Sequence, residues 1–475
     1  MNESVLSEVA NADFGDLRLN RRLEKLVSEL GRQPNHSIPA ATKGRAEMEA
    51  AYRFCDNAKV TPEKILQPHR QATLNRVSQC PFAVLAQDTT ELDLTRPNQQ
   101  VDGAGPMDSE VRRGAFVHPL HAFNAEGVPL GTVWQQSWAR AEIDTATSQA
   151  EKKKKRKKTP IEDKESHRWV EGLRAARDVA EACPETTCVC VADSEGDIYE
   201  LLAEPRELSH GGQLHLLVRG CQTRSTDQSN WRKEARCSKV LYRDTVKVSA
   251  RKAKIEATKN KRQKSREGRT AELVVKATTV TLTPPWRFDR KLPLIDLNIV
   301  LVEEVDVPEG AEAIEWLLVT SLPIETAAQV QDVVNAYRVR WQIEILFRTL
   351  KSGCKVEERH FETLDRVLNV VAIYQIIAWR VAYLCYLGRN CPDLSCEVVF
   401  EPCEWKAVYR VHHPELPQQV PKLNEMIELI SSLGGYIIRK ATDPGVQTLW
   451  LGLQRAYDIT TAWNAFGPEA KQKNL

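Results

Sequence analysis

Helical spacing of apolar residues is clearest in the C-terminal third of the chain. One apolar stripe recurs at steps of four, three and four residues: Val339, Ile343, Leu346 and Leu350. The pattern predicts one helix whose opposite side, within roughly 80° of arc, carries five polar residues: Tyr337, Arg340, Glu344, Arg348 and Lys351. One carboxylate among cations and a phenol suits a metal ion and a phosphate backbone better than proton transfer alone.

Residues 1–75 have the pattern of short helices. An apolar stripe is formed by four leucines: Leu19, Leu23, Leu26 and Leu30. A second helix is predicted over residues 46–54. Cations surround the leucine stripe: Arg18, Arg21, Arg22 and Lys25. The segment is either a small bundle with a cationic surface or a module that contacts DNA.

From residue 81 the pattern changes to that of strands. A short apolar strand over residues 81–86 leads to Asp88, and a buried strand over residues 187–192 ends on Asp193. Further strands are predicted over residues 114–124 and 131–138, and helices over residues 169–182 and 197–202. Strand, acid, loop and helix in this order predict an α/β sheet with functional groups at strand ends.

Two further segments complete the predicted organisation. Residues 213–320 are rich in Val, Ile, Leu and Thr, with Pro-containing turns, and predict a mostly β insertion with strands over residues 273–282, 294–305 and 316–320. From residue 364 onward the pattern is helical again. Its apolar segments cover residues 370–387, 426–438 and 450–463.

The composition describes a folded protein of several domains. The chain has 475 residues, of which 42% are hydrophobic and 27% charged, and this length exceeds one ordinary core. No apolar run is long enough to cross a bilayer, and the first 30 residues are charged rather than signal-like. We therefore expect a cytoplasmic protein with no membrane partner. The twelve cysteines lack paired zinc-ligand spacing and are interpreted as reduced, mostly packed thiols.

Local charge differs sharply from the net charge of +2. Residues 152–158 read Lys-Lys-Lys-Lys-Arg-Lys-Lys, and residues 251–269 hold nine basic residues against two acidic ones. Such runs are usually solvated loops, and contact with nucleic acid is the second interpretation.

Three acids stand out: Asp88 and Asp193 at the ends of predicted strands, and Glu344 on the predicted helix. Phosphodiester hydrolysis or exchange needs an activated water or hydroxyl and a stabilised leaving 3′ oxygen, which two divalent metals held by carboxylates can supply. Each acid also has an ordinary explanation. A strand-end Asp is a common turn or cap former, and Glu344 can pair with Arg340 or Arg348 at helical spacing.

The combination of these residues is more specific than any one of them. The pattern Tyr337-x-x-Arg340-x-x-x-Glu344-x-x-x-x-x-x-Lys351 closely resembles the Tyr-Arg-Glu-Lys signature of bacterial insertion-sequence transposases of the Tn-five kind. Residues 86–90 (Ala-Gln-Asp-Thr-Thr) and 191–197 (Val-Ala-Asp-Ser-Glu-Gly-Asp) are similar to the motifs around that family's first two acids. Residues 14–18, 49–54 and 433–436 are similar to its terminal regions.

The resemblance implies a fold and a domain order. It implies an α/β fold with an RNase H-like catalytic core, an Asp-Asp-Glu triad and a mostly β insertion, flanked by helical N- and C-terminal domains. We expect a helical DNA-binding domain over residues 1–75 and a catalytic domain over residues 76–375, with the insertion at 213–320. A helical dimerisation domain is expected over residues 376–475. The 151-residue step from Asp193 to Glu344 leaves room for the insertion.

The resemblance also implies a cut-and-paste transposase that cuts the ends of its element through a hairpin intermediate. Asp88, Asp193 and Glu344 would be catalytic and hold two Mg²⁺ ions, for which Mn²⁺ substitutes. Expected DNA contacts come from eleven residues: Tyr337, Arg340, Arg348, Lys351, Arg219, Trp316, Arg18, Arg21, Arg22, Lys25 and Arg53. The expected partners are double-stranded DNA, both element ends and target, and a second copy of the chain in a paired-end complex. The expected location is the bacterial cytoplasm, at the nucleoid.

Two other functions share most of these features. A catalytically silent relative would act as a DNA-binding regulator, and the presence of all three acids argues against it. A nuclease of the same fold would cut DNA without strand transfer. Assays of both cleavage and joining on a supercoiled target separate these functions.

Overall fold

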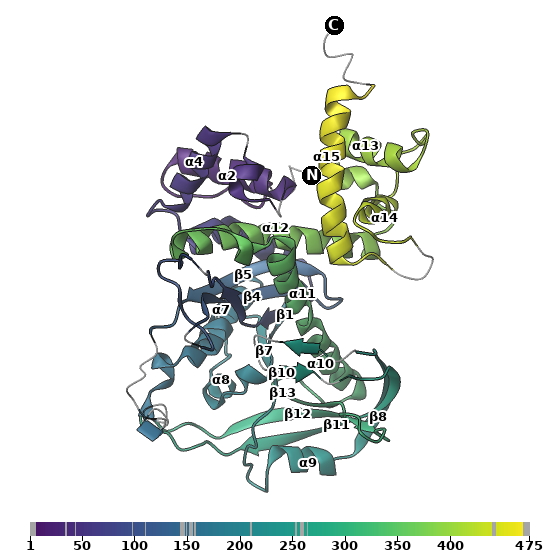
Figure 1. The fold of residues 1–475 in the computed structure, drawn as a ribbon. Coiled ribbons are helices and arrows are strands. Elements are labelled where there is room, and N and C mark those ends of the chain that lie inside the picture. The colour runs from purple at the N-terminus through teal and green to yellow at the C-terminus, as the bar shows by residue number, and fades with distance from the viewer. Residues whose placement is uncertain are drawn as a thin grey trace. The chain divides into compact units, whose positions relative to one another are not determined.

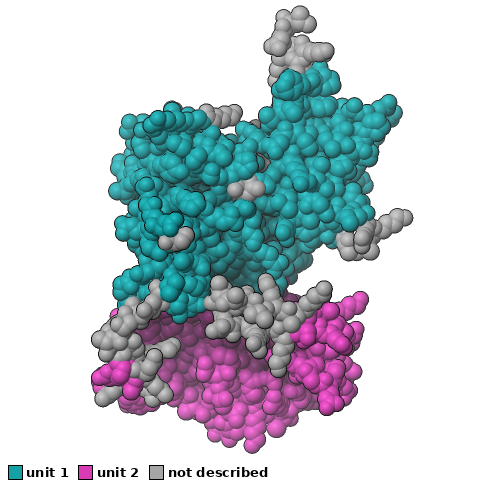
Figure 2. Space-filling model, viewed as in Figure 1, with its two compact units in different colours: residues 1–146, 341–475 teal, residues 147–340 magenta. Residues whose placement is uncertain are grey.

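The computed structural model describes most of the chain (Figure 1). The described residues are 6–33, 36–42, 44–96, 98–109, 111–142, 148, 150–151, 155, 158–209, 211–251, 254–256, 261–263, 265–438 and 443–468. The chain forms two compact units, coloured separately in Figure 2: unit 1 is residues 1–146 and 341–475, and unit 2 is residues 147–340. Most of the basic run at 152–158 and much of the stretch 251–269 lie outside the described residues, so their contact with nucleic acid stays a prediction.

The N-terminal part of unit 1, as far as the structure describes it, contains the helices α2 (Leu17–Arg32), α3 (Ile38–Ala41), α4 (Arg45–Cys55) and α5 (Pro62–Val77). Helix α2 starts after Asp16, whose carboxylate accepts a hydrogen bond from the backbone N–H of Arg18 and caps the first turn. Leu23, Leu26 and Leu30 are buried and Leu19 packs partly buried against the same core, which confirms the predicted leucine stripe. The helix predicted over residues 46–54 is α4.

The strands of unit 1 are built around β4 (Arg113–Asn124). It pairs antiparallel with β1 (Phe82–Gln87) and β2 (Thr90–Asp93), and also with β5 (Pro129–Trp138) and the short β3 (Gly105–Pro106). All but the two end positions of β4 are buried, so both faces of this strand are covered. The strands predicted over residues 81–86, 114–124 and 131–138 are β1, β4 and β5.

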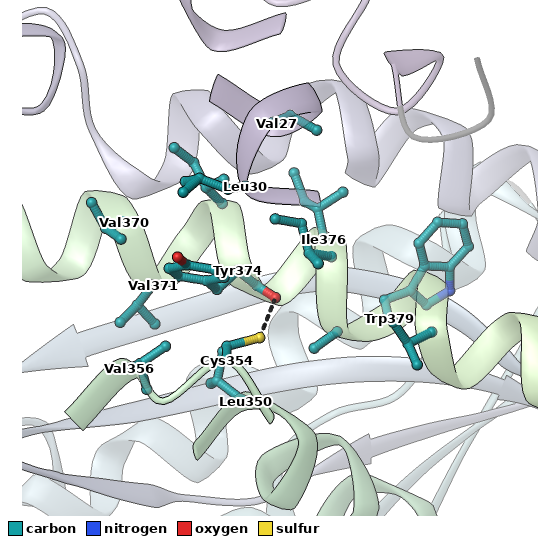
Figure 3. Close-up of a cluster of buried hydrophobic side chains, with 14 of the residues drawn as sticks. Val27, Leu30, Leu350, Cys354, Val356, Val370, Val371, Tyr374, Ile376 and Trp379 are labelled. Carbon is teal, nitrogen blue, oxygen red and sulfur yellow. Dashed lines mark hydrogen bonds between the residues drawn. The ribbon is translucent and has the colours of Figure 1, made fainter. Parts of the chain in front are cut away.

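Helix α12 (Leu364–Asn390) is the core helix of unit 1. Figure 3 shows the cluster around it, with ten labelled side chains: Val27, Leu30, Leu350, Cys354, Val356, Val370, Val371, Tyr374, Ile376 and Trp379. The Cys354 thiol donates a hydrogen bond to the Tyr374 carbonyl oxygen at 3.9 Å. Within the described residues, α12 is the one helix long and apolar enough to cross a membrane, and 83% of its most apolar window is buried inside the protein. Such burial is typical of a core helix.

The C-terminal part of unit 1 contains η6 (Cys396–Val398), α13 (Pro402–His412), α14 (Leu423–Leu433) and α15 (Val446–Phe466). Helices α14 and α15 approach closely because two glycines face the neighbouring backbone. A Cβ atom at Gly434 would lie 1.9 Å from the Thr448 carbonyl oxygen, and one at Gly452 would lie 1.8 Å from that of Ile430. Trp450 of α15 is buried, whereas Leu451 and Phe466 of the same helix are 39% and 87% exposed, so unit 1 covers only part of the apolar surface of this helix.

Unit 2 combines a parallel strand pair with an antiparallel sheet. Strands β6 (Thr187–Ala192) and β7 (Gln213–Arg219) are parallel, and α7 (Arg168–Ala182) contacts both. The order continues antiparallel from β7 through β13 (Glu315–Thr320), β12 (Ile295–Val305), β11 (Arg269–Leu282) and β8 (Val240–Val248). The shorter elements are η1 (Ile161–Asp163), η2 (Glu165–His167), η3 (Ser194–Gly196), α8 (Tyr199–Ala203), α9 (Trp231–Cys237), β9 (Lys254–Glu256) and β10 (Lys261–Gln263).

The β-rich segment of unit 2 agrees with the predicted strands. The strands predicted over residues 273–282, 294–305 and 316–320 are β11, β12 and β13. Strand β7, at the predicted start of the insertion, differs from them because it pairs in parallel with β6 and extends the α/β sheet. Spacing of apolar residues does not distinguish a parallel from an antiparallel partner, so only the fold reveals this assignment.

The helix predicted to carry Tyr337 through Lys351 is interrupted, so the prediction of one continuous helix was wrong. Helix α10 (Ala327–Arg340) ends at Arg340, Trp341 forms a turn, and α11 (Gln342–Arg348) follows. The predicted apolar stripe is nevertheless buried at all four of its positions.

A wider turn follows α11. The π-helix η4 spans Thr349–Gly353, and the backbone N–H of Cys354 donates to the Thr349 carbonyl oxygen at 2.9 Å. The backbone of Gly353 lies against the Trp450 ring, from which a Cβ atom there would be only 3.2 Å away. Tertiary packing therefore accompanies this π turn, which leads into η5 (Val356–Glu358).

Candidate active site

Asp193 and Arg219 stand at the carboxyl ends of neighbouring parallel strands in unit 2. The register pairs Ala192 of β6 with Val218 of β7, so the next residue of each strand, Asp193 or Arg219, emerges at the same edge of the sheet. Strand β6 is buried at every position except its first, and Asp193 is the first partly exposed residue beyond it. The prediction that this strand ends on Asp193 is confirmed.

Asp193 also caps a turn, as the ordinary explanation of a strand-end Asp predicts. Its Oδ1 atom accepts a hydrogen bond from the backbone N–H of Glu195 at 2.8 Å, at the start of η3. A carboxylate has about four lone-pair positions, so one capping bond leaves capacity for a cation. The cap therefore orients Asp193 without excluding a role as a metal ligand.

Asp197, whose role sequence reasoning missed, anchors the loop that follows β7. Its buried carboxylate accepts hydrogen bonds from the backbone N–H groups of Cys221 and Gln222, both at 2.7 Å, and forms an ion pair with Arg224. The loop begins directly after Arg219's neighbour Gly220, so this network fastens the β7 end to the segment after β6. The signal in the sequence was the third acid of the run Asp-Ser-Glu-Gly-Asp at residues 193–197.

Helix α10 brings Tyr337 to the same part of unit 2, because it packs on β6 and β13. The Tyr337 ring meets the half-buried Trp316 of β13 edge-on, with 5.6 Å between ring centroids, and its phenol hydrogen-bonds with Arg219. Burial raises the pKa of Tyr337, nearby Asp193 adds to the rise, and Arg340 and Arg219 oppose it. Tyr337 therefore stays protonated at neutral pH and keeps a hydrogen to donate.

Unit 1 carries the other two predicted acids. Asp88 is partly exposed in the two-residue break between β1 and β2, where the backbone N–H of Thr89 donates to its Oδ1 at 2.7 Å. Glu344 is partly exposed in the first turn of α11, which is anchored by the buried Ile343 and Leu346. Both carboxylates are thus attached to elements whose apolar residues are fixed in the core.

The last two cations of the signature lie close in sequence to Glu344. The Lys351 ammonium is 3.5 Å from a carboxylate oxygen of Glu357, which also accepts the backbone N–H of Asp93 at 2.9 Å. Arg348 is exposed and lines a cavity of about 450 Å³ together with Arg389. Arg389 also pairs with Asp443 at 3.7 Å, whereas Arg348 presents its charge at the surface of α11.

The predicted N-terminal contacts lie on the surface of α2 and α4. Arg22 and Lys25 pair with Glu47 at 2.5 and 2.6 Å, and Arg18 pairs with the carboxylate that caps α2 at 2.9 Å. The remaining two are exposed: Arg21 and Arg53. Surface ion pairs contribute little to stability because water screens them, so a phosphate can displace these acids at small cost.

The donor chemistry fits a divalent metal. Asp88 and Glu344 belong to unit 1 and Asp193 to unit 2. Within the part of the chain that the structure describes, no three His, Cys, Asp or Glu side chains gather closely enough to hold a metal ion. Convergence of the three acids therefore stays a prediction. Partly exposed carboxylates at the ends or first turns of regular elements are oxygen ligands of the kind that a divalent metal ion binds.

Comparison with protein families finds three matches in order along the chain. Residues 1–60 match the family "Transposase DNA-binding", and residues 170–379 match "Transposase DDE domain". Residues 376–463 match "Transposase Tn5 dimerisation domain".

Among solved structures, the chain resembles one described as "Cryo-EM structure of piggyBac transposase synaptic complex with hairpin DNA". The sequence identity is 9% and the TM-score is 0.36, over 99% of this chain and 82% of that chain. A likeness this distant does not bear on the function of the chain.

Asp197→Asn should destabilise the protein by about 3–5 kcal/mol, because it leaves the largely buried guanidinium of Arg224 without its counter-charge. Urea unfolding of the full-length protein measures this loss. Asp227→Asn is the matched control from the loop after β7, since it makes the same substitution at an exposed acid and should change stability by no more than about 1 kcal/mol. Equal losses in the two variants would contradict the anchoring role of Asp197.

Proposed function

Because this chain belongs to the DDE transposases of the Tn5 type, we propose that it excises a DNA element at its ends and joins it to target DNA through a hairpin intermediate. The family makes it a DNA-binding, metal-dependent enzyme that cleaves DNA. The observation that carries the proposal is the succession of DNA-binding, DDE and dimerisation families along one chain. The finer steps rest on the residues described above.

In this proposal Asp88, Asp193 and Glu344 supply the carboxylates of the metal site. Two Mg²⁺ ions, with Mn²⁺ as a substitute, would lower the pKa of an attacking water and stabilise the leaving 3′ oxygen. Partial exposure of all three acids supports the assignment, because a metal ligand must be reachable by DNA and solvent. The capping bond of Asp193 and the buried anchor residues of α11 support it further, since they hold the acids in defined directions.

The phenol and cations of the signature bind the DNA backbone. Tyr337 keeps its hydrogen and donates it to a phosphate oxygen, while Arg340 and Arg219 supply positive charge beside it. Arg348 and Lys351 extend this cationic surface along the strand. Tyr337 and Arg340 are only 7% exposed, so DNA would reach the tips of these side chains alone, which restricts the direction of each contact.

The reaction consists of successive transfers at phosphorus, each forming one P–O bond as another breaks. A water first releases a 3′-OH at the element end. That hydroxyl attacks the opposite strand and closes a hairpin, which a second water opens. The regenerated 3′-OH then attacks target DNA. Every nucleophile is water or a DNA hydroxyl, so no side chain of the chain becomes covalently attached.

Two element ends must be held together for a complete excision. The N-terminal cations on α2 and α4 would bind the ends, and the C-terminal region would pair two copies of the chain. A symmetric dimer achieves this with one repeated interface. The match of residues 376–463 to a dimerisation family supports this paired-end complex.

Asp88→Asn, Asp193→Asn and Glu344→Gln should each abolish strand cleavage while leaving binding to end DNA nearly unchanged. Each substitution removes a metal ligand, and loss of a negative charge does not weaken attraction to phosphate. The assay selects bound DNA from a random pool, then measures cleavage and joining with Mg²⁺.

The control for the acid variants is Asp332→Asn, which removes an exposed acid from α10 and should leave cleavage unchanged. Robust cutting by any triad variant would remove that residue from the site. Binding without any cutting by the unaltered protein would indicate a regulator, and cutting without joining would indicate a nuclease.

Lys351→Ala and Arg340→Ala should each reduce the slope of log affinity against log salt concentration by about one, because each removes one phosphate contact. Fluorescence anisotropy on end DNA over a range of salt concentrations measures the slope. Lys233→Ala, which removes an exposed cation from α9, should leave it unchanged. A slope unaltered by the first two substitutions would exclude both side chains from the DNA interface.

Trp316→Ala should slow hairpin formation roughly tenfold, because stacking on an unpaired base contributes about 1–3 kcal/mol. Single-turnover assays on end DNA measure this step separately from binding. Trp286→Ala is the control, since Trp286 is 78% exposed on the connection between β11 and β12. Unimpaired hairpin formation by folded Trp316→Ala protein would leave Trp316 with only its packing against Tyr337.

A further inference from the structure

The strands on either side of Asp88, β1 and β2, pair with β4 in one continuous register. Strand β1 pairs with β4 up to Gln87 opposite Leu120, and β2 resumes with Thr90 opposite Val117. Each side of the ladder advances by three residues between these pairs, so the register does not slip. Strands β1 and β2 are therefore one extended run, interrupted only at Asp88 and Thr89.

The interruption has a cause in β4. By the unchanged register, Asp88 stands opposite Pro119 and Thr89 opposite His118. Proline has no backbone N–H to donate and is unusual in the middle of a strand that has partners on both sides. Pro119 therefore removes a ladder hydrogen bond at the point where Asp88 leaves the sheet.

The His118 side chain bridges this gap. Its ring is fully buried; Nδ1 lies 2.8 Å from the Thr89 hydroxyl and Nε2 lies 3.1 Å from Oε1 of Gln87. An amide oxygen only accepts, so Nε2 carries a hydrogen and donates it to Gln87. In the neutral ring with its hydrogen on Nε2, the Nδ1 atom accepts a hydrogen bond from the Thr89 hydroxyl. One tautomer therefore makes both hydrogen bonds at once.

These contacts bear on the direction of Asp88. Successive side chains of an extended run point to opposite faces, so Gln87 and Thr89 share the face of His118 while Asp88 points to the other. One ring thus holds both sequence neighbours of the acid. We propose that His118 is a positioning residue for Asp88, fixing the direction of its carboxylate toward the metal. The inference rests on the proposed function of Asp88 as a metal ligand.

The test measures binding of Mn²⁺ alone to the full-length protein by electron paramagnetic resonance, with the thermal unfolding midpoint recorded for each variant. His118→Ala should raise the Mn²⁺ dissociation constant about tenfold or more, as loss of a partner that orients a ligand commonly does. His118→Gln should restore most of the affinity, because one amide offers a donor and an acceptor to the same two neighbours. A fully structural role would move the unfolding midpoint without this rescue of metal affinity.

His121→Ala is the matched control. His121 is also a fully buried histidine of β4, and its ring contacts the Thr132 hydroxyl at 3.0 Å on the β5 side. Its loss should lower the unfolding midpoint while leaving the Mn²⁺ dissociation constant unchanged. An equal change of metal affinity in His118→Ala and His121→Ala would overturn the proposal.

Thr89→Val provides a second variant if His118→Ala does not fold. It removes only the hydroxyl at a partly exposed position and should weaken Mn²⁺ binding severalfold. Asp88→Asn separates the proposed role of Asp88 as a metal ligand from the proposed role of His118 in positioning it. Unchanged Mn²⁺ binding by the Asp88→Asn variant would refute Asp88 as a metal ligand. If Asp88→Asn weakens Mn²⁺ binding but folded His118→Ala or Thr89→Val protein binds Mn²⁺ normally, only the role of His118 is refuted.

Discussion

Burial of α12 is the constraint on which unit 1 depends. This helix contacts α2, α4 and α5 from the N-terminal segment, β5 from the strands, and α14 and α15 from the C-terminal segment. Two of its buried side chains tie the helix to backbone distant in sequence: the Asn369 amide donates to the carbonyl oxygens of Cys55 and Val60, and the Trp379 indole N–H donates to that of Pro129 at 2.9 Å. Residues matched by the DNA-binding and dimerisation families therefore share one hydrophobic core.

The chemistry proposed for this transposase depends on carboxylates held in fixed directions. At Asp193 the fixation comes from a capping bond and from the buried Asp197–Arg224 pair behind it. At Asp88 it comes from His118, which bonds to the residues on either side. In both places the acid itself is partly exposed while its support is buried. This arrangement suits a metal ligand, because burial of the supporting groups limits the angular freedom of an exposed carboxylate.

The cations proposed to bind DNA are held differently. Arg18, Arg22 and Lys25 pair with acids on the protein surface, and Arg348 is exposed. A phosphate replaces a surface carboxylate with little loss of free energy. Weak pairing therefore keeps such side chains hydrated and available to a DNA phosphate. Tyr337 and Arg340 are the exception, since burial restricts them to short-range contacts.

The sequence by itself determined the elements whose apolar spacing is regular. Leu23, Leu26 and Leu30 indicate α2, and the apolar run at residues 187–192 indicates β6 and the position of Asp193. Burial of one helix face or of a strand places apolar residues at regular intervals, and this spacing is visible in the local sequence. The four-position signature likewise identified the family, because the spacing between its side chains can be seen in the sequence without the fold.

Only the tertiary structure decided the features set by partners distant in sequence. The π turn at Thr349–Gly353 accompanies packing against Trp450, and the break between α10 and α11 is invisible in an unbroken apolar stripe. The parallel pairing of β7, the anchoring of Arg224 by Asp197, and the bridge from His118 to Gln87 and Thr89 also join residues 26 to 31 positions apart. Periodicity reports that a side chain is buried but not which group it meets, so these contacts became visible only in the folded chain.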